Sequence, residues 1–287
     1  MTAPMQTALP YGIRDIKLTP YLDALGTVLG NNSVDLPYAQ TLSFSEAEET
    51  TELRGDDKLV TIHGQGAQVD LSLESGGISL AAWKILTGGS LVEEGVAPNR
   101  RIRLRKRSSD TRPYFRVEGQ SVSDSGGDVH VIIYRCRLNG DLAGDFTDGE
   151  FFVSNASGQG LPLLDDTNDL LYDFVQNEQK AAISLTPTPN PLPTPQNVVP
   201  GALTATSVAL NWDDVANATG YVVERSVSPF SSWTAVGSSA GGEPTTSNTT
   251  VTGLDASTAY KFRVKAVLPG GTSDPSIDTG VVTTPSA

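Results

Sequence analysis

The sequence has little of several features that would narrow its function. It holds one cysteine, Cys136, among 287 residues, so no internal disulfide can form. It has no run of about 20 apolar residues, the length that a membrane-spanning helix needs, so we expect no membrane insertion. The first residues also lack a basic region followed by an apolar run, the pattern of a cleaved signal peptide. We therefore expect a soluble protein that is made inside a cell.

Basic residues are also scarce. The chain has 20 basic and 33 acidic residues and a formal charge of −13, which disfavours binding to nucleic acid through its phosphates. Most of this charge, 16 basic and 26 acidic residues, lies before residue 186. The hydrophobic content of 38% is enough for compact cores on both sides of that position.

The sequence lacks the residue patterns of a catalytic or metal site. His63 and His130 lie in strand-like segments far from any nucleophile motif, which favours polar positions on a strand face. Cys136 alternates with apolar residues and is typical of a small core residue. The segment DLAGDFTDGE at 141–150 misses the spacing of a calcium loop, so a solvated loop is favoured. The sequence predicts no enzyme, no cofactor and no metal.

A proline-rich segment, TPTPNPLPTP at 186–195, predicts a boundary between two domains. Five of its ten residues are proline, which has no amide proton for a helix or a sheet. Such a segment favours extended polyproline II structure and would reach roughly 30 Å. We predict a first domain over 1–185, a linker over 186–195 and a second domain over 196–287.

The second domain carries the alternation of short strands that is typical of a β-sandwich. SVALNWDDV, GYVVERS and AYKFRVKAV each place apolar side chains at every second position. With VTGLDASTAYKFRVKAV, they resemble a fibronectin type III domain, in which a tyrosine hydroxyl bonds to upstream backbone. The resemblance implies four core residues, which are Trp212, Tyr221, Leu254 and Tyr260. Trp233 is either a candidate contact for a surface ligand or a cover for the sandwich edge.

The first domain also has more strand than helix. Five segments alternate β-branched or aromatic residues between turn residues, and ISLAAWKILTGG is the exception, with apolar residues at helical spacing and a Gly88-Gly89 stop. In their order, YGIRDIKL, the stretch 43–89, the arginine-rich strand, RPYFRVEGQSVS and DVHVIIYRCRL resemble the major tail tube proteins of long-tailed bacterial viruses. The resemblance covers roughly residues 10–185.

That resemblance implies a mainly β fold, a tail-tube-type β-sandwich with one short flanking helix, followed here by a fibronectin type III β-sandwich. It implies a virion protein, synthesised in the host cytoplasm, whose hexameric rings stack into a tube around a tape-measure protein. Tail terminator and baseplate or tip proteins would close its ends, and DNA would pass through the channel without specific binding. The C-terminal module would face outward, where a host cell-surface glycan is a candidate partner.

Two charged segments are candidates for the ring interface or the channel. EAEETTELRGDD holds six acids, which favours a loop that orders only with a partner, and by resemblance contacts the next ring or lines the channel. RRIRLRKR would place four arginines on one face of a strand, where a solvated face, a nucleic-acid patch and pairing with a neighbour's carboxylates are alternatives. The candidate residues are Glu46, Glu48, Glu49, Glu52, Asp56, Asp57, Arg101, Arg103, Arg105 and Arg107.

The main rival interpretation is a secreted or surface protein that binds carbohydrate or mediates adhesion. In it, the fibronectin-like domain would be a spacer, and the protein would be exported and monomeric. An accessory domain of an enzyme is a further alternative.

Overall fold

The computed structural model describes residues 6–55, 58–164, 169–236, 245–268 and 271–287. The described residues are mainly β, with a single short helix, as the sequence predicts. The chain divides into two compact units: residues up to Leu164 with Asp169–Pro189 form the first, and Asn190–Ala287 belong to the second. The division lies inside the proline-rich segment.

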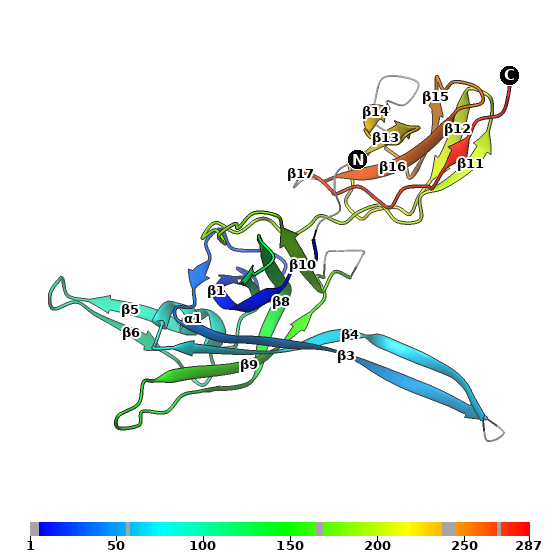
Figure 1. Ribbon diagram of the computed structural model, residues 1–287. Helices are drawn as coiled ribbons and strands as arrows, with labels where there is room; N and C mark the ends of the chain where they lie inside the picture. The colour runs from blue at the N-terminus through cyan, green and yellow to red at the C-terminus, as the bar shows by residue number, and fades with distance from the viewer. Residues whose placement is uncertain (1–5, 56–57, 165–168, 237–244, 269–270) are drawn as a thin grey trace. The chain divides into compact units, whose positions relative to one another are not determined.

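The first unit is built on one antiparallel sheet with the strand order β2-β1-β7-β8-β9-β4-β3, and β10 adds to β8 (Figure 1). Its strands are β1 (Pro10–Pro20), β2 (Val34–Asp35), β3 (Ala39–Gly55), β4 (Lys58–Gly76), β7 (Phe115–Ser123), β8 (Asp128–Ala143), β9 (Val153–Leu161) and β10 (Tyr172–Asn177). The first half of β8 pairs with β7 and β10 and the second half with β9. A strand has only two edges, so β8, which has three neighbours, changes partners along its length. The sheet therefore curves, and it encloses a core.

That core is formed by alternate side chains of the strands. Ile16, Val69, Val117 and Ile133 are fully buried in it, and so is Cys136, which is a core residue as expected. Burial raises the pKa of the Cys136 thiol, because the thiolate would lose its hydration. This thiol is therefore suited to packing.

Helix α1 (Leu80–Thr87) covers part of the core with Ala82, Ile85 and Leu86. Ser79 caps its first turn, since its side chain accepts a hydrogen bond from the Ala82 amide, and Gly88 ends it with φ 79°. Ile78, which the helical spacing included, precedes the cap and is exposed. The helix is thus shorter than expected at its N-terminal end.

A strap, residues 178–189, leads from β10 to the boundary of the first unit and is bonded along its length. The Ala181 amide donates to Asp128, the Ser33 amide donates to the Leu185 carbonyl, and Ile183 is buried. The fully buried Arg116 donates to both the carbonyl and the hydroxyl of Thr188 at 2.6 and 3.1 Å. The first proline-rich residues therefore bind the first unit, and the extended spacer remains a prediction for the rest.

This arrangement predicts where the first unit can be cut. A chain that ends at Pro189 should be more stable than one that ends at Leu185 by about 1–3 kcal/mol, because the shorter chain leaves the buried Arg116 without Thr188. Urea unfolding of both chains, followed by circular dichroism, measures the difference. Identical midpoints would show that the Thr188 contacts contribute nothing.

The second unit is a sandwich of two antiparallel sheets, β11-β12-β15 and β14-β13-β16-β17, with β18 paired to β16. Its strands are β11 (Val199–Leu203), β12 (Ser207–Asn211), β13 (Gly220–Val227), β14 (Thr234–Val236), β15 (Asn248–Thr252), β16 (Ala259–Leu268), β17 (Gly271–Thr272) and β18 (Val282–Thr283). Trp212, Tyr221, Leu254 and Tyr260 all lie in its buried core. The Tyr260 hydroxyl accepts a hydrogen bond from the upstream Asp255 amide at 2.9 Å, which ties the turn to β16.

Candidate interaction surfaces

The ends of β3 and β4 form a two-stranded arm that extends from the first unit (Figure 1). Strand β9 pairs with β4 only over Val69–Gly76, so among the described residues β3 and β4 pair only with each other from Glu48 and Ala67 onward. We call this segment, residues 48–55 and 58–67, the arm. An isolated two-stranded hairpin is marginally stable in water, and its free edges are templates for another strand.

Apolar side chains emerge on both faces of the arm. Leu53 stands opposite Thr61, while Ile62 stands opposite Glu52, and cross-strand partners share a face. Four of these side chains have exposed fractions between 46% and 63%: Leu53, Leu59, Val60 and Ile62. These side chains do not belong to the core of the first unit, so the arm is a candidate contact surface.

The acidic segment EAEETTELRGDD does not form the loop that the sequence predicts, because residues 46–55 belong to β3. The reason is that its acids face small or apolar partners, with Glu46 opposite Val69 and Glu48 opposite Ala67. Glu46 accepts a hydrogen bond from the Tyr172 hydroxyl at 2.7 Å, and Glu52 pairs with Arg54 at 2.7 Å. Two of the candidate acids are therefore bound within their own chain. Asp56, Asp57 and the side chain of Glu49 lie outside the described residues.

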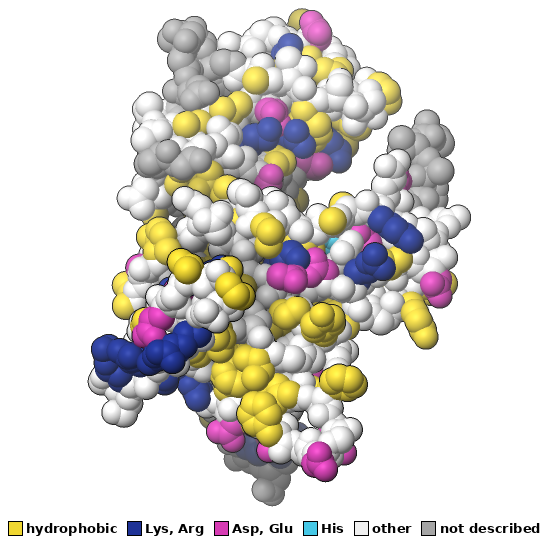
Figure 2. Space-filling view, turned by 90° about the vertical axis from the view of Figure 1, so that its left-hand side faces the viewer, with side chains coloured by type: hydrophobic (Ala, Val, Ile, Leu, Met, Phe, Trp, Pro, Cys, Tyr) yellow, Lys and Arg dark blue, Asp and Glu magenta, His cyan; other side chains and the backbone are white. Residues whose placement is uncertain are grey.

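The arginine-rich segment forms β6 (Arg101–Arg105), which pairs with β5 (Ser90–Glu94) in a separate hairpin. Figure 2 shows a dense group of Lys and Arg side chains on the side of the molecule where this hairpin lies. Arg101 and Arg103 both bind the Glu94 carboxylate at 2.6 Å, and Arg100 binds Glu93. Pairing of these arginines with their own hairpin was not expected. The strand does not present the four-arginine face that the sequence predicts, since Arg107 lies beyond it. Arg101 and Arg103 are already bound to Glu94, so their charges are partly compensated.

His130 is not a polar residue on an open strand face but part of a buried polar network. Its Nε2 lies 3.3 Å from Asp128 and 2.9 Å from the Ala181 carbonyl of the strap. Asp128, fully buried, also accepts hydrogen bonds from Gln120 and Asn177. Burial opposes ionisation of Asp128, but these donors together with His130 outweigh it and lower the pKa of Asp128. His63, by contrast, is exposed on β4.

Acid should loosen the strap through Asp128. A carboxyl whose pKa is lower in the folded than in the unfolded chain stabilises the fold above its unfolded pKa, near 3.8, and this contribution is lost as the pH falls through the folded value. Asp128→Asn should cost about 1–3 kcal/mol at pH 7 and progressively less below about pH 4, whereas Asp124→Asn on an exposed turn should cost little. Urea unfolding across this pH range tests the expectation. A cost that does not change with pH would contradict it.

Trp233, the candidate ligand contact, is partly buried before β14. The Arg263 guanidinium lies over its ring at 4.2 Å, and Arg263 is itself bound to Glu224. One face of the ring is therefore occupied by a cation of the same unit. Binding of a glycan at Trp233 stays a prediction.

A cleft of about 390 Å³ on the first unit was not identified from the sequence. Arg135 and Arg137 stack on the Tyr114 ring at 4.3 and 5.2 Å, and Arg112 donates to the Gly140 carbonyl at 2.6 Å. The residues that line the cleft are Arg112, Tyr114, Arg137, Leu138, Asn139, Gln159 and Leu161. The alternation of Arg135 and Arg137 along one strand was the only sequence signal for this site.

Two kinds of feature are absent from the described residues. No group of three or more His, Cys, Asp or Glu side chains is placed to hold a metal ion there. No described helix is long and apolar enough to cross a membrane.

Comparison with known proteins identifies the second unit. Residues 193–281 match the family model of the fibronectin type III domain, so the chain carries such a domain at its C-terminal end. A fibronectin type III domain fits a modular or adhesion-type protein. No curated protein matches the chain.

Similar solved structures include titin kinase with its flanking domains (29% identity, 32% of this chain, 17% of that chain, TM-score 0.29). Another is the twitchin kinase region from C. elegans (26% identity, 34% of this chain, 17% of that chain, TM-score 0.30). A third is an FN3 domain of human collagen XX (25% identity, 36% of this chain, 100% of that chain, TM-score 0.28). This chain thus covers 17% of the length of each of the two kinase structures.

Proposed function

We propose that the chain is a structural virion protein, the major tail tube protein of a long-tailed bacterial virus. Copies of it would join into stacked, hexameric rings that form the conduit for DNA during ejection. The observation that carries the proposal is the arm, whose strands pair with no third strand among the described residues and which has apolar side chains on both faces. Such an element reaches its full stability only when a second chain covers it.

The surrounding features support the same function. The first unit has its own core, so it can present the arm and the β5–β6 hairpin as extensions of a folded body. A formal charge of −13 suits a conduit that DNA must leave without binding, because carboxylates repel phosphates. This function needs no turnover and no cofactor. Its partners would be further copies of the chain, a tape-measure protein, and tail terminator and baseplate or tip proteins.

The fibronectin type III domain also favours a second candidate, a secreted or surface protein that binds carbohydrate or mediates adhesion. In the tail tube proposal this domain instead faces outward from the tube, where it is available to a host cell-surface glycan. The two functions differ in the state of the purified protein.

Electron microscopy of the purified protein over a wide range of concentrations tests the proposal. The tail tube function predicts hollow fibres of constant diameter at high concentration, or when a tape-measure protein is added. The adhesion function predicts monomers throughout. Monomers under all these conditions would overturn the tail tube function.

A further inference from the structure

We propose that the cleft around Tyr114 is the docking site for the acidic loop of a second copy of this chain, residues 144–152. This inference rests on the proposed function, because that function supplies the second copy. It goes further by naming the two surfaces that meet and the chemistry that joins them.

The cleft contains two guanidinium groups that can bind carboxylates. Arg112 and Arg137 line it, and in the described part of the chain neither of them forms an ion pair. Gln159, which also lines the cleft, donates a hydrogen bond to Asp70 at 3.2 Å. Guanidinium groups bind carboxylates through paired hydrogen bonds, which gives both affinity and orientation. The cleft therefore has donors to spare for an incoming acid.

The positions of these donors are fixed by neighbouring groups. Arg112 is bound to the Gly140 carbonyl, and Arg137 lies over the Tyr114 ring. Arg135 holds the same ring and donates to the Leu25 carbonyl at 2.9 Å. A site that is already ordered loses little side-chain entropy when it binds a partner.

The acidic loop presents the matching groups. Asp145, Asp148 and Glu150 are exposed, and among the described residues none of them forms an ion pair. Beside Glu150, the Phe151 side chain is 97% exposed, so it is offered to solvent without cover. An exposed aromatic residue next to an acid is typical of an interface anchor, and the leucines of the cleft give it apolar surface to cover.

The base of this loop is anchored, so Phe151 is held outward. The ring of the neighbouring Phe152 packs against two other rings, with its centroid 4.7 Å from that of Phe146 and 6.0 Å from that of Trp83. The Phe152 carbonyl also accepts a hydrogen bond from the Gly77 amide at 2.8 Å. Since successive residues point in opposite directions in an extended chain, the inward packing of Phe152 turns Phe151 outward.

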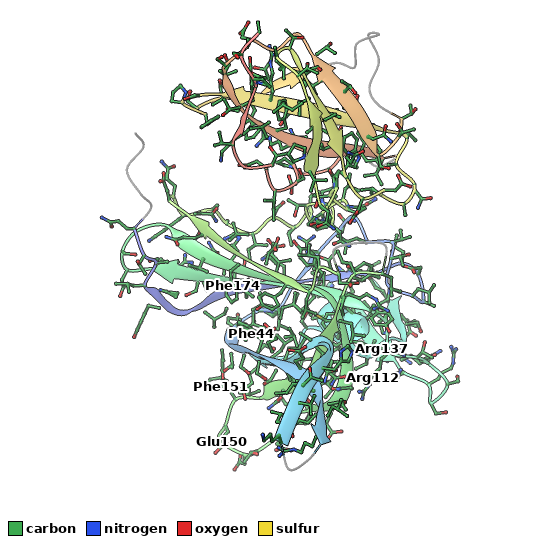
Figure 3. The ribbon with its side chains drawn as sticks, turned by 90° about the vertical axis from the view of Figure 1, so that its right-hand side faces the viewer. Phe44, Arg112, Arg137, Glu150, Phe151 and Phe174 are labelled. Atoms are coloured by element: carbon green, nitrogen blue, oxygen red, sulfur yellow. The ribbon has the colours of Figure 1, made fainter. Side chains whose placement is uncertain are left out.

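The two surfaces lie on different sides of one molecule. Figure 3 shows Glu150 and Phe151 on one side of the β3–β4 hairpin and Arg112 and Arg137 on the other. A loop therefore meets the cleft of a neighbouring copy in a head-to-tail contact. Repeated contacts of this kind close into a ring when their rotation adds to a full turn.

Substitutions on either surface should weaken assembly. Arg137→Glu in the cleft, or Glu150→Lys with Phe151→Ser in the loop, should raise the critical concentration for assembly about tenfold or more, because like charges would meet. Asn139→Asp is a milder cleft variant, since it adds a carboxylate at an exposed position without removing an arginine. The exposed strap residues provide matched controls: Lys180→Glu and Glu178→Lys should leave the critical concentration unchanged. Thermal unfolding of each variant shows whether it is folded.

Cross-linking tests the contact without requiring tubes. Protein with Asn139→Cys mixed with protein with Phe151→Cys should form a dimer with a short bismaleimide, whereas Lys180→Cys in place of Asn139→Cys should not. The single natural thiol, Cys136, is buried and should not react. A cross-linked dimer without tubes would support the docking site and overturn the tail tube function. Tubes with neither a cross-link nor an effect of the charge reversals would overturn the docking site alone, and monomers without a cross-link would overturn both.

Discussion

A chain whose arm has been removed should fold but remain monomeric. Replacing residues 49–66 by Asn-Gly would join Glu48 to Ala67, which already pair, through a turn suited to two antiparallel strands. The arm lies outside the core of the first unit, so its removal should change the free energy of unfolding by about 1 kcal/mol or less. Assembly should be lost at every concentration at which the full chain forms tubes, because the free edges and apolar faces are gone.

Circular dichroism during urea unfolding measures whether the arm-deleted chain is folded. Sedimentation and electron microscopy measure whether it assembles. A second variant, Val60→Thr with Ile62→Thr, keeps residues that favour strands and removes only exposed apolar surface. It should weaken assembly without abolishing it, since the strand edges remain. Tubes of normal length from the arm-deleted chain would show that assembly uses other surfaces.

The β-sandwich of the second unit could be predicted because its strands are buried on one face. In such strands every second residue must be apolar, and Phe262, Val264 and Ala266 follow that rule. The strand register of the first unit could not be predicted from such a pattern. Its arm is exposed on both faces, so no buried face fixes its register. The β4 half belongs to a segment that alternates, but the six acids within 46–57 favoured a loop for the β3 half. Backbone pairing prevails there because Glu46, Glu48 and Glu52 stand opposite Val69, Ala67 and Ile62, which carry no charge.

The remaining errors have a common physical origin, which is contact between segments that no local pattern connects. Glu94 meets Arg101 because β5 and β6 pair across a turn that the sequence did not identify. His130 is buried because the strap, which shows no periodic pattern, crosses over β8. The cleft joins residues that precede β7 with residues of β8 and β9. Local patterns predict which strands form, whereas function depends on which strands meet.

Trp212→Ala should unfold the second unit while leaving the first unit and its assembly intact. The side chain lies in the core of the sandwich with its ring 5.2 Å from that of Tyr221. Removing a buried tryptophan costs about 3–5 kcal/mol, which is a large part of the stability of a small domain. The first unit has a separate core, to which Trp212 does not belong.

The other two tryptophans report on the units separately. Trp83 belongs to the first unit and Trp233 to the second, so fluorescence during urea unfolding, with one or the other replaced by Phe, follows each unit by itself. In Trp212→Ala, the Trp233 transition should move to much lower urea while the Trp83 transition stays in place. Trp233→Ala is the matched control, because that side chain is partly exposed and its loss should cost far less. If the Trp83 transition moved as far as the Trp233 transition, the two units would have to unfold together, and the second unit could not be an independent module on the surface of a tube.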